Sequence, residues 1–260
     1  MKRRLWTTSE VWVTAAAAML IGSVTAWALA PRPLSEPLAR YVTTVRGRTP
    51  NQVHNAALAA RSIHGRVILP GEVFSFNQLT GSWSSDSGYR LAPVSFDGEL
   101  VPGWGGGVCQ TSSTLYNAAL LAGMTILERH RHQWIPRYVP AGRDAAVAWS
   151  SIDLKFRNDL AFPVQVEAEV RGDLLRCGLV AARRPERTYS VEQDTLGGAR
   201  AAVVEQPWNV GLGYKRVKNP GRDGRRVRTY RITRFPSGET KRELLSDDRY
   251  PAMNRLVLVR

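Results

Sequence analysis

The chain has 260 residues, of which 43% are hydrophobic and 22% charged. This composition allows one large folded domain or two small ones and excludes an intrinsically disordered chain. The net charge is +14, and the segment from Arg183 to Arg260 holds 18 basic and nine acidic residues, so it carries +9 of that excess. Such a segment is attracted to an anionic polymer or a membrane surface. A general arginine bias of the whole chain would produce the same excess without any anionic partner.

The N-terminus predicts a membrane anchor. Basic residues at positions 2–4 precede an apolar stretch from Val11 to Ala30, which as a helix would span roughly 30 Å, the thickness of the hydrocarbon core. Because basic residues keep their end in the cytoplasm, we predict a single-pass signal-anchor over residues 1–30 and an extracytoplasmic chain beyond it. This location argues against nucleic acid as a partner. The alternative is a cleaved signal peptide ending at Ala30, although Pro31 disfavours cleavage there.

A first helix is predicted after a proline-rich spacer that covers residues 31–48. In the run Thr49-Pro50-Asn51-Gln52, the threonine would cap the helix, the proline would take its first position and the glutamine would complete a capping box. Apolar residues then recur at helical spacing from Val53 to Ile63, and Gly65 provides a left-handed stop.

Strands and a second helix are predicted for the middle of the chain. Residues 101–107 contain four glycines and predict irregular backbone that turns sharply or approaches something closely. They lead into a helix over residues 108–122, which Gly123 ends. The predicted strands are residues 67–76, broken at Pro70-Gly71, and the alternating stretches 164–170 and 175–179, with a turn at 156–159. Short strands at 229–233 and 256–259, around a turn at 236–238, make the C-terminal part β-rich.

The residues with the most chemical information surround Cys109. Three glycines place this cysteine in the first turn of the predicted helix, where the macrodipole and free backbone N–H groups stabilise a thiolate. The same N–H groups would hold an oxyanion during acyl transfer. Downstream, His132 and Asp144 supply the base and the orienting acid of a thiol triad. We therefore predict Cys109 as nucleophile, His132 as general base and Asp144 as the group that orients it.

Other interpretations of the cysteines remain open from the sequence. Cys109 would also suit a small buried position in a core. Outside the membrane, Cys109 and Cys177 would be free to form a disulfide, which would abolish the nucleophile. Two distant cysteines and one His-x-His pair do not match a standard zinc ligand set, so no metal or cofactor is predicted.

Several motifs resemble the VanW-like family, in the family's order, from about Asn51 to Val170. They are residues 70–77, Gly88-Tyr89, Pro102-Gly103, the run from Gly105 to Ala118, residues 128–132, 138–145 and 153–158. The resemblance implies an exported bacterial protein, in some cases encoded with glycopeptide-resistance functions and often joined to wall-binding modules. It implies no settled biochemical activity. Within these motifs we predict the following binding residues: Gly105, Gly106, Gly107, Gln110, Asn117 and Tyr138.

The predicted fold class is α+β, in three parts after the anchor. Residues 31–48 are the spacer, residues 49–182 form a mixed α/β VanW-like domain with antiparallel strands, and residues 183–260 form a β-rich module that resembles the G-five module of wall enzymes. Tyr250 and other aromatic residues of this module would stack on sugar rings, although core packing explains aromatics more often.

Two functions of different classes follow. The first is a wall-associated protein that acts on peptidoglycan by thiol-dependent acyl transfer or peptide hydrolysis. The second is a non-catalytic wall-binding scaffold or a glycopeptide-resistance accessory, in which the glycine-rich motif is purely architectural. The expected partners are peptidoglycan or another anionic wall polymer, and the cytoplasmic membrane through the N-terminal helix. A close contact between Cys109 and His132 would favour the first function.

Overall fold

The computed structural model describes residues 33–96, 99–149, 151–207 and 215–259. The predicted signal-anchor lies outside these residues. Within them, no helix is both long and apolar enough to cross a membrane. Residues Leu34–Arg260 form one compact unit.

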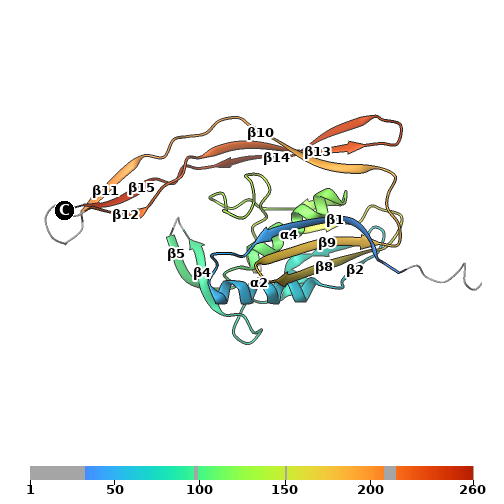
Figure 1. Ribbon diagram of the computed structural model, residues 1–260, viewed down its shortest axis with the longest axis horizontal. Helices are drawn as coiled ribbons and strands as arrows, with labels where there is room; N and C mark the ends of the chain where they lie inside the picture. The colour runs from blue at the N-terminus through green and yellow to red at the C-terminus, as the bar shows by residue number, and fades with distance from the viewer. Residues whose placement is uncertain (1–32, 97–98, 150, 208–214, 260) are drawn as a thin grey trace, which may run out of the picture. The chain divides into compact units, whose positions relative to one another are not determined.

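The described ranges contain three helices and fifteen strands (Figure 1). The helices are α2 (Pro50–Ile63), α3 (Phe76–Thr80) and α4 (Val108–Leu121). The strands up to residue 181 are β1 (Glu36–Thr44), β2 (Val67–Ile68), β3 (Val73–Ser75), β4 (Leu91–Phe96), β5 (Glu99–Trp104), β6 (Thr125–Glu128), β7 (Lys155–Arg157), β8 (Val164–Arg171) and β9 (Leu174–Ala181). The remaining strands are β10 (Thr188–Thr195), β11 (Val203–Pro207), β12 (Lys215–Asn219), β13 (Arg225–Arg234), β14 (Thr240–Tyr250) and β15 (Arg255–Val259). The described chain is therefore strand-rich, and its named strand pairs are antiparallel except for β11 with β15.

A four-stranded sheet and two helices enclose the main core. The sheet has the order β1-β9-β8-β2, and both α2 and α4 pack against it and against each other (Figure 1). Alternate residues of β8 point inward, as the period of two requires: Val164, Val166 and Ala168 are buried. The predicted antiparallel pair of strands in this region is thereby confirmed.

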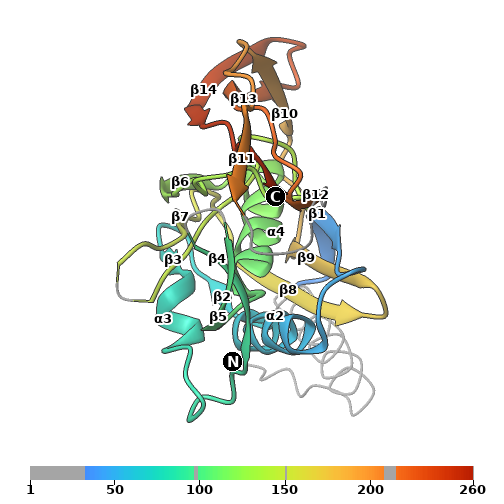
Figure 2. The same ribbon diagram turned by 90° about the vertical axis from the view of Figure 1, so that its left-hand side faces the viewer.

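Helix α4 is the central element of this core. It contacts β1 and β9 on one side and β6 and β10 on the other, and it stands between these strands in Figure 2. A helix covered on all sides has no face for charged residues, which explains why this one is built from small, hydroxyl and apolar residues. Its buried hydroxyl groups find backbone acceptors: Thr111 donates to the Ala56 carbonyl at 3.0 Å and Ser112 to the Ala145 carbonyl at 2.6 Å.

The predicted start of α2 and the predicted glycine stops after α2 and α4 are confirmed. Thr49 accepts from the Gln52 N–H, and the Gln52 side chain accepts from the Thr49 N–H, so the capping box is present. Gly65, just past the end of α2, has a φ of 78°, and Gly123, just past α4, has a φ of 79°. Both are left-handed stops that favour glycine.

The spacer prediction is wrong for residues 36–44. They form β1, an edge strand that pairs with β9 over its whole length. The stretch gave no strand signal because two of its residues that meet the core are polar: Tyr41 packs against it, and Thr43 is buried and hydrogen-bonded to Thr114 at 2.9 Å. A polar residue with a partner can replace an apolar one on the inner face.

Two further predictions of irregular structure need correction. Residues 101–104 belong to β5, which pairs with β4 as a hairpin. A side chain at Gly103 would meet Val94 at 2.7 Å, so glycine suits this position of the strand. Phe156 and Arg157 belong to β7, the central strand of the β3-β7-β6 sheet. Phe156 is fully buried and stacks on Phe74 with 4.6 Å between ring centroids.

The C-terminal part is β-rich, as predicted. It forms two three-stranded sheets, with the orders β10-β13-β14 and β11-β15-β12. The predicted boundary after residue 182 falls between β9 and β10, although Leu34–Arg260 remain one compact unit. Strand β14 carries two residues that bind the candidate site, and Gln193 of β10 and Thr229 of β13 hydrogen-bond the adjacent loop at Ala141 and Gly142.

Candidate functional site

The glycine-rich loop before α4 is pressed against the protein's own backbone. Gly107 has a φ of 112°, and a Cβ atom there would lie 2.2 Å from the Gln52 carbonyl oxygen. A Cβ at Gly106 would lie 2.7 Å from the Pro93 carbonyl oxygen. Glycine is therefore required by packing at both positions. Binding roles for Gly105, Gly106 and Gly107 stay predictions.

Cys109 lies in the first turn of α4, as predicted. Its side chain is half-buried, and its Sγ is 3.3 Å from the Val147 carbonyl oxygen, to which a neutral thiol donates. Cys177 is 1% exposed in the core, and both cysteines are free thiols, so the disulfide interpretation is wrong. Burial raises the pKa of the Cys177 thiol, which leaves Cys109 as the cysteine suited to chemistry.

His132 and Asp144 form a hydrogen-bonded pair. His132 Nδ1 is 2.7 Å from Asp144 Oδ2, and the His132 backbone N–H donates to the same oxygen at 2.6 Å. The Asp144 side chain is fully buried, whereas that of His132 is 21% exposed. Because Nδ1 faces the carboxylate, Nε2 is the nitrogen left for Cys109, whose thiol lies close enough to this imidazole for each group to shift the pKa of the other. The structure thus brings the three predicted residues together.

The electrostatics of the three groups favour an ion pair. Burial raises the pKa of Cys109, but the hydrogen bond and the positive charge of His132 outweigh it and hold that pKa below its ordinary value. Burial lowers the pKa of His132, yet Asp144 and Cys109 raise it to about 9. Burial raises the pKa of Asp144, yet His132 and Arg129 lower it to about 2. Near neutral pH the arrangement therefore favours an imidazolium and a carboxylate, and it lowers the pH at which the Cys109 thiol ionises.

Tyr138 lies beside this group. Its ring meets the His132 ring edge-on, with 6.5 Å between centroids and 84° between the planes, and the Arg48 guanidinium sits 5.1 Å above the tyrosine ring. The side chain is half-buried, and burial raises the pKa of its hydroxyl. Tyr138 is therefore close enough to border whatever occupies the site.

Gln110 and Asn117 are buried and hydrogen-bonded within the chain. Gln110 donates to the Thr44 carbonyl at 2.8 Å and accepts from Arg48 at 3.1 Å. Asn117 donates to the Arg143 carbonyl at 2.7 Å and accepts from the Arg143 side chain. Both amides thus fix neighbouring backbone, and a role in binding stays a prediction.

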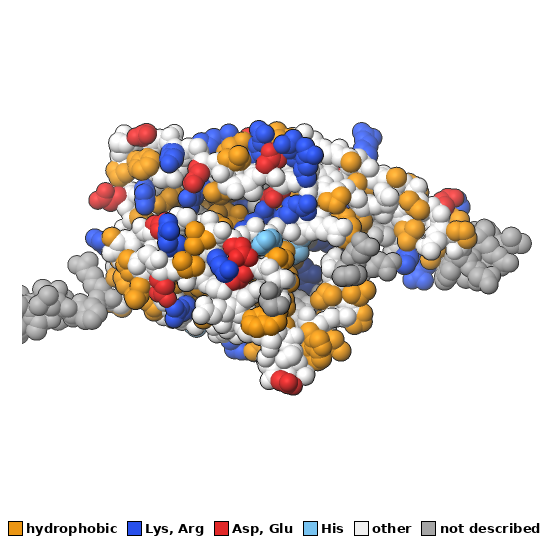
Figure 3. Space-filling view, turned by 180° about the vertical axis from the view of Figure 1, so that it is seen from behind, with side chains coloured by type: hydrophobic (Ala, Val, Ile, Leu, Met, Phe, Trp, Pro, Cys, Tyr) orange, Lys and Arg blue, Asp and Glu red, His pale blue; other side chains and the backbone are white. Residues whose placement is uncertain are grey.

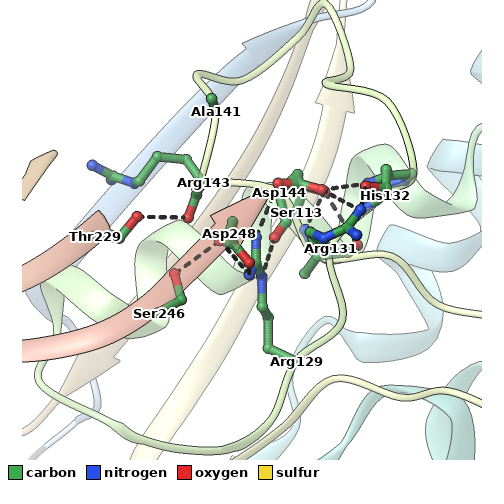
Figure 4. A network of polar contacts seen from close by, with 12 residues as sticks. Ser113, Arg129, Arg131, His132, Ala141, Arg143, Asp144, Thr229, Ser246 and Asp248 are labelled. Atoms are coloured by element: carbon green, nitrogen blue, oxygen red, sulfur yellow. Dashed lines mark hydrogen bonds and ion pairs between the residues drawn. The ribbon is translucent and has the colours of Figure 1, made fainter. Parts of the chain in front are cut away.

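Three residues of the site were not predicted from the sequence. Arg129 donates to Asp144 Oδ1 at 2.9 Å and to both oxygens of Asp248 at 2.7 Å (Figure 4). The Tyr250 hydroxyl donates to Asp144 Oδ1 at 2.5 Å. Tyr250 is 3% exposed, so of the two interpretations given to the aromatic residues of this segment, core packing applies to it and stacking on sugar rings does not. Arg129 stands in a motif next to His130, but no spacing connects Asp248 or Tyr250 with residues more than 100 positions earlier.

The described part of the protein has a hollow on one face (Figure 3) and a cavity that borders Arg129 and Asp248. Histidine side chains reach the surface at the edge of a hollow on the face that Figure 3 shows. Between β6 and β14 lies a cavity of about 500 Å³, whose lining includes Arg129 and Asp248. Among the residues that the structure describes, no cluster of His, Cys, Asp and Glu could hold a metal ion.

The sequence profile described as "VanW like protein" matches residues 51–180, half of the chain. This protein belongs to the VanW-like family. Two curated proteins share the region: "Uncharacterized protein YoaR" of Bacillus subtilis is 41% identical over 138 residues, and "Vancomycin B-type resistance protein VanW" of Enterococcus faecalis is 30% identical over 153 residues. The matches cover 53% and 56% of this chain, and 46% and 55% of those proteins, so the chain spans about half the length of the relatives it matches.

Cys109, His132 and Asp144 all lie inside the VanW-like region, whereas Asp248 and Tyr250 lie outside it. One solved structure, described as "Crystal structure of HP0197-G5", aligns with 28% of this chain and 95% of its own chain, at 17% identity and a TM-score of 0.17. A TM-score this low supports no statement about fold, so the G-five likeness of residues 183–260 stays a prediction.

Proposed function

We propose that this VanW-like protein is an exported cell-wall protein whose Cys109 carries out thiol-dependent acyl transfer or peptide hydrolysis on peptidoglycan. The observation that carries the proposal is the placement of Cys109 beside His132, which in turn is hydrogen-bonded to the buried Asp144. Its relative in Enterococcus faecalis is named for vancomycin resistance, and vancomycin is a glycopeptide antibiotic, which supports a role at the wall.

The chemistry needs only groups that the chain supplies. The Cys109 thiolate attacks a carbonyl carbon, so an Sγ–C bond forms, while the backbone N–H of Cys109 itself stabilises the oxyanion. The N–H groups of Val108 and Gln110 are already bonded to the Gly105 and Gly107 carbonyls. The amide C–N bond then breaks, and the leaving nitrogen takes a proton from His132 Nε2. Water or an acceptor amine next attacks the thioester and gives its proton to Nε2. The Sγ–C bond breaks and the thiolate–imidazolium pair is restored.

A trapped acyl-enzyme tests the proposal. The exported chain is incubated with peptidoglycan fragments, quenched in acid and analysed by intact-mass and peptide mass spectrometry. We expect an acyl adduct on Cys109 that is absent from Cys109→Ser and His132→Ala and retained in Cys177→Ser. A well-folded Cys109→Ser protein with full biological activity would end the enzyme proposal.

A non-catalytic scaffold is the second candidate. Two observations favour it: the glycine-rich loop is pressed against backbone at Gln52 and Pro93, and the Gln110 and Asn117 amides are used internally. Both features explain parts of the motif without any substrate. The Cys109→Ser experiment separates the two candidates, since a scaffold tolerates this change.

We further propose that the basic C-terminal segment retains the protein on an anionic wall polymer and that residues 1–30 tether it to the membrane. Several arginines of the segment are already paired: Arg226 and Arg228 contact Asp247, and Arg242 contacts Asp194. Retention would therefore depend on basic residues outside these pairs. Membrane fractionation of the full chain, with external protease removing everything beyond the anchor, tests the tether.

A further inference from the structure

The Asp144 carboxylate is held on both oxygens. Oδ2 accepts from the backbone N–H and from Nδ1 of His132, and Oδ1 accepts from Arg129 Nη2 at 2.9 Å and from the Tyr250 hydroxyl at 2.5 Å. The His132 bonds face Cys109. The bonds from Arg129 and Tyr250 reach the other oxygen, Oδ1, and Tyr250 is a residue of β14.

The direction of the Tyr250 hydrogen bond is fixed by its surroundings. Its oxygen accepts the Gly142 N–H at 2.8 Å and an Arg129 N–H at 3.4 Å. Its single proton is then free for the remaining neighbour, Asp144, which as a carboxylate only accepts. Because Gly142 and Asp144 lie on one loop, Tyr250 fixes both the loop backbone and the carboxylate that it carries.

Asp248 acts one contact further away. It binds Arg129 through both oxygens at 2.7 Å and accepts from Ser246 at 2.8 Å. The side chains of Arg129 and Asp248 are 7% and 9% exposed. The same guanidinium donates through Nε to the Asp144 carbonyl oxygen at 2.6 Å. Both bonds to Asp248 come from one nitrogen, Arg129 Nη1, while Nη2 and Nε bind Asp144, so the buried guanidinium joins the two acidic residues and fixes their geometry.

We propose that Tyr250 and Asp248 of β14 are positioning residues that orient the Asp144 carboxylate toward His132 and thereby hold the Cys109–His132 pair. The thiol site would then be completed by a strand that lies outside the VanW-like region of residues 51–180. This inference deepens the proposed function and relies on it for the role of Cys109. The pairing itself can be measured without any substrate.

Many charged and titratable groups surround the Cys109–His132 pair. The test variant and its control should therefore leave the charge of all of them unchanged. They are Cys109 and Tyr116 on α4, Arg129, Arg131, Tyr138 and Arg143 in the loops, Arg48 above Tyr138, and Asp248 and Tyr250 on β14. Tyr250→Phe removes one hydroxyl and no formal charge at neutral pH. Tyr230→Phe on the neighbouring β13 removes a hydroxyl from a residue that contacts Arg242 instead, and is the matched control.

The test is the pH profile of iodoacetamide alkylation at Cys109, followed by peptide mass spectrometry on the full exported chain. In Tyr250→Phe the loop that carries Gly142 and Asp144 loses the hydroxyl that anchors it, so the carboxylate turns away from His132, the imidazolium is less stabilised and the thiol titrates at higher pH. A hydroxyl that only competed with His132 for the carboxylate would do the opposite: its loss would stabilise the imidazolium, and the thiol would titrate at lower pH. We expect the alkylation rate at pH 7 to fall several-fold, up to about tenfold for a shift of one pKa unit. Asp144→Asn should shift the profile in the same direction and further, and Tyr230→Phe should not shift it.

A second variant guards against loss of folding in Tyr250→Phe. Asp248→Asn removes a negative charge beside Arg129, so this arginine interacts more strongly with Asp144 and competes with His132. We expect the His132 pKa, followed by NMR of its ring protons, to fall from about 9 toward 6.5.

Each outcome decides the inference. A profile shifted to higher pH in Tyr250→Phe together with a lowered His132 pKa in Asp248→Asn supports it, whereas a shift to lower pH in Tyr250→Phe would overturn it. Profiles that match wild type in folded Tyr250→Phe, while Asp144→Asn shifts, would show that Tyr250 is only structural and overturn it. Profiles unchanged even in Asp144→Asn and His132→Ala would overturn it as well, because no pair would exist to position. A Tyr250 effect without any acyl-enzyme would keep this inference and remove the proposed function.

Discussion

A single oxygen of Asp144 accepts two hydrogen bonds from one residue, the backbone N–H and the ring Nδ1 of His132, at 2.6 and 2.7 Å. The two bonds fix the rotation of the imidazole and place its proton on Nδ1. They leave Nε2 for the thiol of Cys109. This relationship makes the pairing of Cys109 with His132 testable by titration.

The two cysteines should differ sharply in reactivity. Cys109 should be alkylated near neutral pH, with a midpoint below the roughly 8.5 of a free cysteine. Cys177 should react only after unfolding, because it is 1% exposed and its thiol pKa is raised by burial. Iodoacetamide labelling with peptide mass spectrometry, with and without urea, measures both. Slow labelling of Cys109 at every pH would indicate an inert buried thiol.

Stability should depend on pH through the His132–Asp144 pair. The folded pKa of His132 is about 9 against 6.5 ordinarily, so its contribution is complete below pH 6.5 and is lost as the pH rises through 9. The folded pKa of Asp144 is about 2 against 3.8, so its contribution is complete above pH 3.8 and is lost as the pH falls through 2. Between these limits the pair stabilises the fold by about 2 kcal/mol.

Urea unfolding of the Cys109→Ser variant measures this dependence without the thiolate. The free energy of unfolding should decline as the pH rises above 6.5, and the decline should end below pH 9, because this variant lacks the part of the His132 pKa shift that Cys109 causes. The same variant with His132→Gln added should lose that decline. If both proteins show the same slope, the pair contributes nothing to stability in this range.

Asn117→Ala should destabilise the protein without changing the thiol. The substitution leaves the buried Arg143 guanidinium without the Asn117 oxygen that accepts its charge-assisted hydrogen bond. It also leaves the Arg143 carbonyl without the Asn117 N–H that donates to it. Leaving such groups unpaired costs about 2–3 kcal/mol. Thermal unfolding measures the loss, while the midpoint of Cys109 alkylation should stay at the wild-type value. A shifted midpoint with unchanged stability would point to a role of Asn117 in the site.

Gly107→Ala should be far more damaging than a comparable change elsewhere. Its Cβ would lie 2.2 Å from the Gln52 carbonyl oxygen at a φ of 112°, so the loop or α2 must move. Gly71→Ala, at a φ of 77° with nothing within 4 Å of the new Cβ, is the matched control and should cost only about 1 kcal/mol. Soluble yield and unfolding midpoints compare the two, and equal losses would contradict the packing argument.

Retention on purified sacculi should weaken with salt. Contacts between exposed charges fade as the Debye length falls to about 3 Å near 1 M salt. Replacing the exposed arginines Arg225, Arg249 and Arg255 with glutamine should reduce retention at low salt. The control replaces three exposed arginines of the VanW-like region, Arg61, Arg90 and Arg171, which form no ion pair among the described residues, and so removes the same charge. Equal loss in both variants would mean that net charge alone, and not the C-terminal segment, causes retention.

Several features were determined by the sequence alone because their causes are local. The capping box at Thr49 and Gln52, the stop at Gly65 and the placement of Cys109 in the first turn of α4 each depend on residues within a few positions of one another. Side-chain hydrogen bonds at helix ends and left-handed glycines act over that range. The sequence also supplied the residue types of the predicted triad, but not the distances between Cys109, His132 and Asp144.

Only the tertiary structure decided how distant segments complete one another. Residues 36–44 become a strand because β9 offers its edge, and their polar inner residue Thr43 is satisfied by Thr114 on α4. Asp144 is likewise completed by Tyr250, more than 100 residues away. Such hydrogen bonds depend on two segments meeting in space, and no local spacing or periodicity records that meeting.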